Sequence, residues 1–284
     1  MQAMNALNTT RFSQLTTHEE NPWNWNGLKI AWKKTGTAIA STPSIVFIHG
    51  FGACKEHWRF NQPILGQHTS CYAIDLIGFG ASSQPRARLK NETKRGNDFE
   101  YNFDNWGKLV SDFCQQIVQR PVLLIGNSIG GIVCLKAAQE LKEQCRGVVL
   151  ISCATRALDD KQLAKQPYAM QLFRPFLKSL VSQRWLSRNL FRNAASTSVV
   201  QQVLKQAYPS GKNIDEQLIT MLQKPSKRPG ASEAFHGFIN LFDDYLAPQL
   251  MTEIEIPVDL IWGEKDPWEP IQEAKEWKSS IECI

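Results

Sequence analysis

Several features that define common protein classes are missing from this 284-residue sequence. No apolar run approaches the ~20 residues of a membrane-spanning helix, and the polar start MQAMNALNTT has no apolar segment of a secretory signal. The seven cysteines form no C-x-x-C pair, and no histidine stands at metal-ligand spacing. The formal net charge of +5 is too small to indicate nucleic acid by itself. We therefore expect a cytoplasmic protein with reduced cysteines and with neither metal, organic cofactor nor nucleic-acid partner.

The composition, 43% hydrophobic and 21% charged, is that of an ordinary globular protein. Five short runs, apolar on both faces and rich in β-branched residues, alternate with helical patterns. They are Ser44–Ile48, Cys71–Asp75, Val122–Ile125, Gly147–Ile151 and Val258–Trp262. Such runs are typical of a buried, mostly parallel sheet wound on both sides by helices, here expected over 105–118 and 129–142.

The first residues predict two smaller features. Residues 1–20 are expected to form a loose tail. Trp23 to Trp32 is expected to form a hairpin, because Asn26-Gly27 suits a type I′ turn between alternating apolar residues. The core then extends over residues 21–154.

The interval 155–245 contains no strand pattern, and we predict that it is a helical lid inserted before the last part of the core, 246–284. Residues 155–240 hold 13 lysines and arginines against 5 acidic residues, a positive excess of 8. Apolar residues from Met170 to Leu190 follow helical spacing with arginines and lysines interleaved, and Pro175 should bend this helix. Either the helix packs on the core and exposes a charged face, or it forms a basic amphipathic surface that meets a membrane or an anionic substrate. A second insertion, Pro85 to Asp98, is polar and basic and is expected to be a surface loop.

The strongest chemical signal is Gly126-Asn127-Ser128-Ile129-Gly130-Gly131. This G-x-S-x-G directly follows a predicted strand and precedes a predicted helix, which is the context that a nucleophilic serine requires. Small residues allow the sharp turn, which lifts the Ser128 hydroxyl above the sheet beside the free N–H groups of the helix start.

The second signal is His49-Gly50-Phe51-Gly52 at the end of the strand Ser44–Ile48. Its glycines let the backbone turn so that an N–H group from this loop and the N–H of Ile129 can bind an oxyanion. We interpret His49 as a structural residue that braces the loop, since backbone groups do the chemistry in loops of this type.

Taken in order, HGFG, DLIGFGASS, GNSIGG and IWGEKDPWEP resemble the α/β-hydrolase superfamily from about residue 25 onward. GNSIGG together with G-x-x-DPW is similar to a cyanobacterial and plastid group that includes pheophytinase-like hydrolases. Haloalkane dehalogenases and epoxide hydrolases share HGFG and the lid, but they carry aspartate where Ser128 stands.

The resemblance implies Ser128 as nucleophile and the N–H groups of Phe51 and Ile129 as oxyanion donors. It also implies Asp266 as the carboxylate that orients a histidine. Asp266-Pro267 equally suits the start of a helix. Glu264 is the second choice for the acid.

The histidine of the family pattern is absent. It follows the acid by about 25 to 30 residues, whereas only 18 residues follow Asp266, and no histidine occurs after His236. Three interpretations stay open: the chain is shortened before this histidine, it is a non-catalytic relative that binds a ligand, or His236 substitutes as the base. The alternative for His236 is packing within the lid.

The sequence thus predicts a serine-dependent hydrolase of a carboxylic ester or similar acyl bond, acting through an acyl-enzyme on a small hydrophobic substrate. A C–C bond hydrolase on the same framework and a ligand-binding relative are the alternatives.

Overall fold

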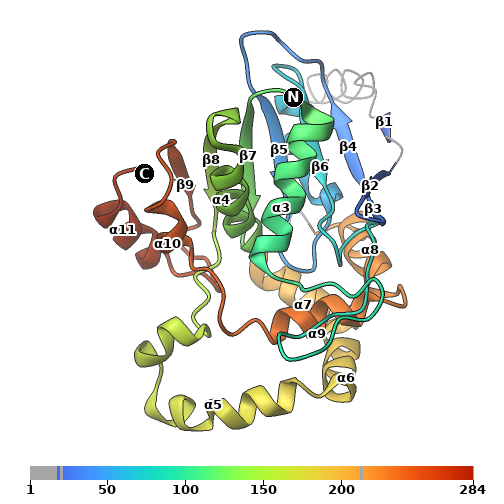
Figure 1. Ribbon diagram of the computed structural model, residues 1–284, viewed down its shortest axis with the longest axis vertical. Helices are drawn as coiled ribbons and strands as arrows, with labels where there is room; N and C mark the ends of the chain where they lie inside the picture. The colour runs from blue at the N-terminus through green and yellow to red at the C-terminus, as the bar shows by residue number, and fades with distance from the viewer. Residues whose placement is uncertain (1–17, 20–21, 212–213, 284) are drawn as a thin grey trace.

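The computed structural model describes residues 18–19, 22–211 and 214–283 (Figure 1). The predicted loose tail therefore lies almost wholly outside the described residues. Within it, His18–Glu19 (β1) pair antiparallel with Trp32–Thr35 (β4), so the tail prediction is wrong for these two residues.

Seven strands form the main sheet, in the order β1-β4-β6-β5-β7-β8-β9. The parallel strands are β5 (Ser44–Ile48), β6 (Cys71–Ile74), β7 (Val122–Asn127), β8 (Cys145–Ile151) and β9 (Val258–Ile261). Strand β4 pairs antiparallel with β6. The predicted α/β architecture with a mostly parallel sheet is confirmed, and each of the five apolar runs is a strand.

The hairpin is shorter than the sequence predicts. Strands β2 (Trp23–Trp25) and β3 (Leu28–Ile30) form a separate two-stranded sheet. Positive φ angles at Asn26 (51°) and Gly27 (82°) give the expected type I′ turn. Trp32, however, belongs to β4 and lies opposite Ile74 in the main sheet, a long-range pairing that alternation alone does not reveal.

Two helices cover one face of the sheet: α3 (Phe103–Phe113), which continues as a π-helix over Cys114–Val118, and α4 (Ile129–Leu141). Alternation along β5 sends Val46 and Ile48 into the large core under these helices, and Ile45 and Phe47 into a smaller core on the other face. The 3-10 helix Lys55–Trp58 and α2 (Asn61–Leu65) contact that second face.

Residues 155–245, called the inserted helical segment below, connect β8 to the last part of the core and gather at one end of the sheet (Figure 1). The α-helices described in it are α5 (Tyr168–Val181), α6 (Arg184–Ala194), α7 (Thr197–Ala207), α8 (Glu216–Ser226) and α9 (Ala231–Ile239), preceded by a 3-10 helix at Asp160–Lys165. Helices α10 (Ala247–Met251) and α11 (Ile271–Ser280) flank β9. None of the helices described here combines the length and apolar character needed to cross a bilayer.

The faces of α5 are the reverse of a core-packed helix. Arg174 is buried, whereas Phe173 and Phe176 are exposed. The expectation of an apolar face on the core and a solvated charged face is therefore wrong for α5. Proline does occur inside the helix, at Pro175.

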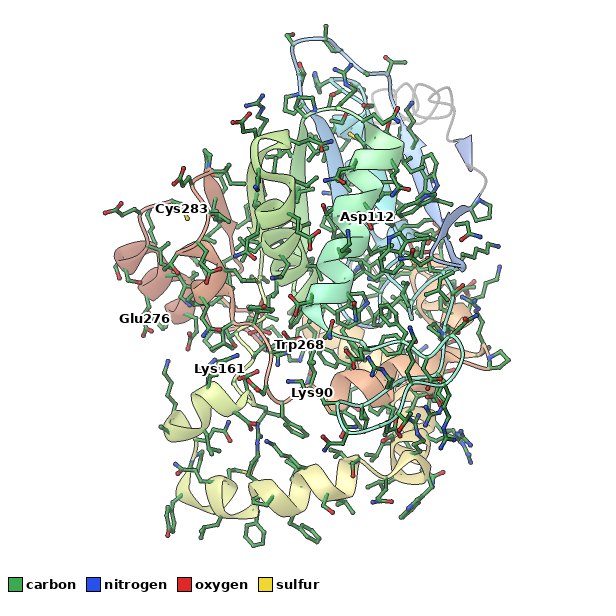
Figure 2. All side chains as sticks on the ribbon, viewed as in Figure 1. Lys90, Asp112, Lys161, Trp268, Glu276 and Cys283 are labelled. Atoms are coloured by element: carbon green, nitrogen blue, oxygen red, sulfur yellow. The ribbon has the colours of Figure 1, made fainter. Side chains whose placement is uncertain are left out.

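The predicted surface loop, Pro85–Asp98, is tied to the inserted helical segment. The Arg184 guanidinium of α6 reaches Glu92 of this loop at 2.6 Å and Glu233 of α9 at 2.7 Å. Lys90 and Lys161 lie near one another in Figure 2, and both face Asp243, at 3.7 and 3.3 Å. The loop is therefore clamped by ion pairs rather than freely solvated.

Candidate active site

Ser128 stands alone between a strand and a helix. Strand β7 ends at Asn127 and α4 begins at Ile129. Ser128 has φ 53° and ψ −123°, a conformation that costs about 1–3 kcal/mol for a residue with a side chain. Its N–H donates to the Ile151 carbonyl of β8 at 3.1 Å, and its side chain is half-buried. The turn therefore presents the hydroxyl at the carboxyl end of the sheet.

Two glycines make this turn possible. A Cβ added at Gly126 would lie 2.3 Å from the Gly130 carbonyl oxygen, and one at Gly130 would lie 2.5 Å from the Ile48 carbonyl oxygen. Both distances are far below van der Waals contact with rigid backbone. Strand, turn and helix therefore approach one another only because both positions lack a side chain.

The loop after β5 adjoins this turn. A Cβ added at Gly50 would lie 3.2 Å from the Ser128 Cβ. Within the described residues, the Phe51 N–H has no acceptor, and Ile129 is the first residue of α4, where N–H groups have no partner inside the helix. The structure thus brings Ser128 together with the loop that carries Phe51 and with the N-terminus of α4.

Hydrogen bonds hold the loop from within. His49 is fully buried; its Nδ1 lies 2.7 Å from the Gly50 carbonyl oxygen, and its Nε2 accepts the Leu76 N–H at 3.1 Å. Nε2 must be unprotonated to accept, so Nδ1 donates. Burial lowers the pKa of His49, which keeps the ring neutral. Gly52, with φ 71°, completes the turn.

A buried carboxylate joins two loops behind Phe51. Asp75 accepts the Lys55 N–H at 2.6 Å and the Ala81 N–H at 2.8 Å, and the Lys55 ammonium lies 3.2 Å away. Cys54, Glu56 and Asp75 offer atoms within 4.8 Å of one another, a spacing that a metal ion could use. The Lys55 ammonium already supplies the positive charge there, since it also lies 2.6 Å from Glu56, so these residues do not fit a metal site.

Asp266 lies in the turn after β9 and is half-buried. Its Oδ1 accepts the N–H groups of Trp268 and Glu269, both at 3.0 Å, and its own N–H donates to Gly263 at 3.2 Å. Asp266 does not cap a helix, because α11 begins only at Ile271. Glu264 is exposed.

Glu269 is a half-buried carboxyl that sequence reasoning missed. Its Oε2 accepts the Thr155 N–H at 2.9 Å and the Thr155 hydroxyl at 2.7 Å. Burial raises the pKa of Glu269. Because its partner stands 114 positions earlier, no local pattern signals this contact. Glu269 fastens the loop after β9 to the segment that follows β8.

Among the described residues, no histidine ring is hydrogen-bonded to Ser128, and the rings of His49, His57 and His236 have other partners. His236 of α9 is buried, and its Nδ1 lies 2.7 Å from the Ser187 hydroxyl of α6. His57 lies 3.3 Å from the Tyr208 hydroxyl. No hydrogen bond joins either ring to Ser128 among the described residues, and His236 packs within the inserted helical segment.

Aromatic rings connect the loop after β5 to this segment. The Phe51 ring stacks on Phe238 of α9 with centroids 4.2 Å apart and lies 6.3 Å from Phe235. Phe79 meets the Phe51 ring edge-on at 5.4 Å. These rings therefore form an apolar cluster between the loop after β5 and α9.

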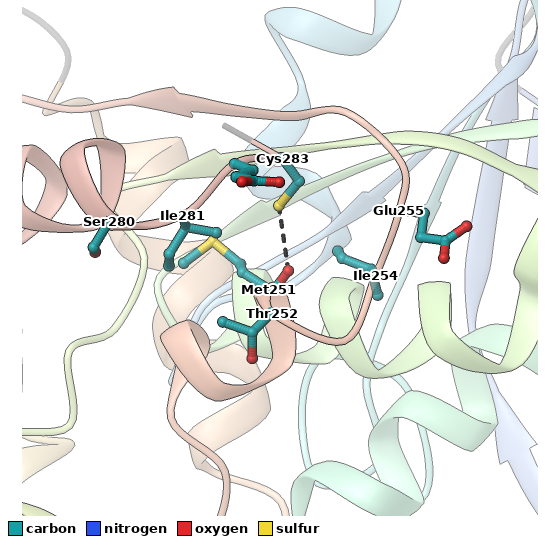
Figure 3. A pocket seen from close by; sticks show the side chains of 8 residues that line it. Met251, Thr252, Ile254, Glu255, Ser280, Ile281 and Cys283 are labelled. Carbon is teal, nitrogen blue, oxygen red and sulfur yellow. Dashed lines mark hydrogen bonds between the residues drawn. The ribbon is translucent and has the colours of Figure 1, made fainter.

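A separate cavity of about 610 Å³ lies between α10 and the end of the described chain (Figure 3). Met251, Thr252, Ile254 and Cys283 line part of it, and the Cys283 thiol donates to the Met251 carbonyl at 3.3 Å. No candidate site residue lines it.

A model of the α/β-hydrolase fold matches residues 43–283, and the chain therefore belongs to the α/β-hydrolase family. Among solved structures, it is similar to a serine hydrolase of carbazole degradation, the CarC enzyme, with a TM-score of 0.68 and 19% identity over 94% of this chain and 88% of that one. An esterase from Exiguobacterium antarcticum gives a TM-score of 0.68 and 18% identity, with the same shares covered. At these identities the structures show the shared fold.

Two proteins similar in sequence allow the length of this chain to be compared with theirs. An uncharacterized hydrolase of Bacillus subtilis, YugF, is 26% identical over 84% of this chain and 78% of its own length. The chloroplastic pheophytinase of Arabidopsis thaliana is 22% identical over 85% of this chain, but the match spans only 55% of that protein. Pheophytinase is thus a distant relative, and the chain corresponds to about half of it.

Proposed function

We propose that this protein is a serine-dependent hydrolase of a carboxylic ester or similar acyl bond. The observation that carries the proposal is the strained turn at Ser128, which lies against a loop whose Phe51 N–H has no acceptor within the described chain. Strain of this kind concentrates at functional sites. Relatives named as a hydrolase and an esterase support the same class.

In this mechanism the Ser128 oxygen attacks the substrate carbonyl and its proton passes to a base. The N–H groups of Phe51 and Ile129 hold the resulting oxyanion. Collapse expels the alcohol, which takes up the proton, and water then releases the acid from the acyl-enzyme. Asp266 is proposed as the carboxylate that would orient the histidine of the family pattern, with Glu264 as the second choice for this acid. His236 is the second choice for the base.

Hydrophobic esters are the proposed substrates. The rings of Phe51, Phe235 and Phe238 lie beside the proposed oxyanion donors, and an apolar wall favours apolar acyl or alcohol groups. We further propose a reducing compartment, since the described cysteines are all free thiols.

A fluorophosphonate probe tests this proposal. We expect slow formation of one phosphonyl adduct per chain, located on Ser128 by peptide mass spectrometry and lost in Ser128→Ala. Asn127→Ala, beside the serine, is not expected to abolish the adduct. A folded protein that takes no adduct would support a ligand-binding relative instead. Ester turnover and diketone cleavage, measured on the same sample, separate the ester hydrolase from a C–C bond hydrolase.

A further inference from the structure

The inserted helical segment carries an apolar face that no described residue covers. Large side chains on α5 and at the start of α6 are exposed by 38 to 73%: Tyr168, Leu172, Phe173, Phe176, Leu180 and Trp185. We call these six residues the apolar outer face. Tyr168, Leu172, Phe176 and Leu180 recur every four residues and so form one stripe along α5. Helix α5 lies at the edge of the molecule, away from the sheet (Figure 1).

The polar side of α5 attaches it to the rest of the protein. Arg174 is 3% exposed, its guanidinium lies 3.3 Å from Asp160, and it stacks 4.6 Å from the centre of the Phe242 ring. Lys178 pairs with the other oxygen of Asp160. Because the charged side of α5 contacts the rest of the protein, its apolar side faces outward. Isolated exposed apolar residues are common, but a contiguous aromatic face marks a contact site.

Positive charge without nearby carboxylate partners accompanies this face. Lys165, Arg188 and Arg192 are exposed, and within the described part of the chain none of them pairs with a carboxylate. The neighbouring acids are already used: Asp159 is paired with Arg156, and Asp160 with Arg174. Exposed aromatic residues on one helix face with arginine and lysine around them are typical of helices that lie in a membrane interface.

We propose that α5 and α6 form a peripheral docking surface for an anionic lipid bilayer. The 14 residues of α5 extend ~21 Å, enough to lie in the plane of the interface. A second copy fits this face less well, since it would bring Lys165, Arg188 and Arg192 against the same cations. The proposal goes beyond the hydrolase function and does not depend on Ser128.

Sedimentation of the full 284-residue protein with phosphatidylcholine vesicles, with or without phosphatidylglycerol, tests the surface. We expect binding to the anionic vesicles and little binding to phosphatidylcholine alone. Phe173→Ser combined with Phe176→Ser should lower the partition coefficient by at least ~10-fold, because two aromatic rings no longer enter the interface. Ile64→Ser, on exposed α2, is the matched control and should bind as the parent protein does.

A second pair of variants separates charge from apolar contact. Arg188→Gln with Arg192→Gln should lower binding by about fivefold per residue at low salt. Lys275→Gln with Lys278→Gln, on α11, changes the net charge equally and should have no such effect. Thermal unfolding checks that every variant is folded.

Three outcomes would overturn the proposal: no binding to anionic vesicles, equal binding by the Phe173/Phe176 variant, or equal losses from both charge pairs. A dimer in solution that the Phe173/Phe176 variant converts to a monomer would assign the face to a second copy instead. Ser128→Ala should bind vesicles as the parent protein does. The vesicle assay therefore tests membrane docking even if the protein is not a serine hydrolase.

Discussion

The ring of Phe238 stacks on the ring of Phe51, with centroids 4.2 Å apart and planes 25° from parallel. Phe238 belongs to α9 of the inserted helical segment, whereas Phe51 belongs to the loop after β5 and carries a proposed oxyanion donor. The position of that N–H is therefore coupled to the packing of α9.

Phe238→Ala should slow fluorophosphonate labelling of Ser128 because the Phe51 backbone loses this support. Phe238 is only partly buried, so the loss of unfolding free energy should be about 1–2 kcal/mol, below the ~3–5 kcal/mol of a fully buried phenylalanine. Labelling rates followed by intact-protein mass spectrometry measure the effect.

Phe191→Ala is the matched control for this variant. Phe191 contacts Phe235 at 5.6 Å, and no ring contact joins it to Phe51 in the described structure. Both variants remove a partly buried ring, but only Phe238→Ala should slow labelling. Equal rates in the two variants would show that the stacking has no influence on the site.

Gly130→Ala should destabilise the fold itself. The added methyl would lie 2.5 and 2.6 Å from the carbonyl oxygens of Ile48 and His49, so α4 must move away from β5. We expect a loss above ~2 kcal/mol in denaturant unfolding. Gly263→Ala, whose new methyl meets nothing closer than 3.8 Å, should stay within ~0.5 kcal/mol of the parent protein. An unchanged unfolding free energy in Gly130→Ala would contradict the close approach of α4 to β5.

Acid should weaken the fold through His57. Burial, with repulsion from the nearby Arg59 guanidinium, lowers the pKa of His57 to about 4, from 6.5 in an unfolded chain. Between these values the unfolded chain binds the extra proton, so stability falls as the pH drops from 6.5 towards 4. One such group contributes about 1.4 kcal/mol per pH unit.

His57→Gln keeps a side chain that can bond to Tyr208 but removes this titration. Unfolding free energy measured at several pH values should therefore fall less steeply towards acid in the variant, while the two proteins converge in slope above pH ~7.

Local patterns predicted the five parallel strands well, because their apolar, β-branched runs differ from the helical patterns between them. They did not predict the antiparallel strands β1 and β4, which are polar in sequence. The turn at Ser128 was also predictable from the sequence. The sharp turn of G-x-S-x-G requires residues without a side chain, and a Cβ at Gly126 or Gly130 would clash with the backbone. The sequence did not predict that α5 turns its charged side inward and its apolar side outward. Arg174 is buried through contacts with Asp160 and Phe242, which no local pattern reveals. The Glu269–Thr155 contact likewise joins residues far apart in sequence.

The position of the base could not be derived from local pattern either, and the structure offers Ser128 no histidine partner among the described residues. A serine hydroxyl without an adjacent base is a weak nucleophile. We therefore expect the 284-residue chain to cleave p-nitrophenyl esters slowly, with only the oxyanion donors and substrate binding acting. Because Ser128 is half-buried rather than enclosed, a small base in solution should reach it.

Imidazole added to the assay should accelerate ester cleavage by about tenfold, less than the 10²–10⁴ that a positioned base supplies. The gain should follow the concentration of neutral imidazole and so increase with pH through 7. Ser128→Ala measures the direct reaction of imidazole with the ester, which is subtracted. An equal acceleration in both proteins would mean that Ser128 takes no part, and the serine-dependent mechanism would then have to be abandoned.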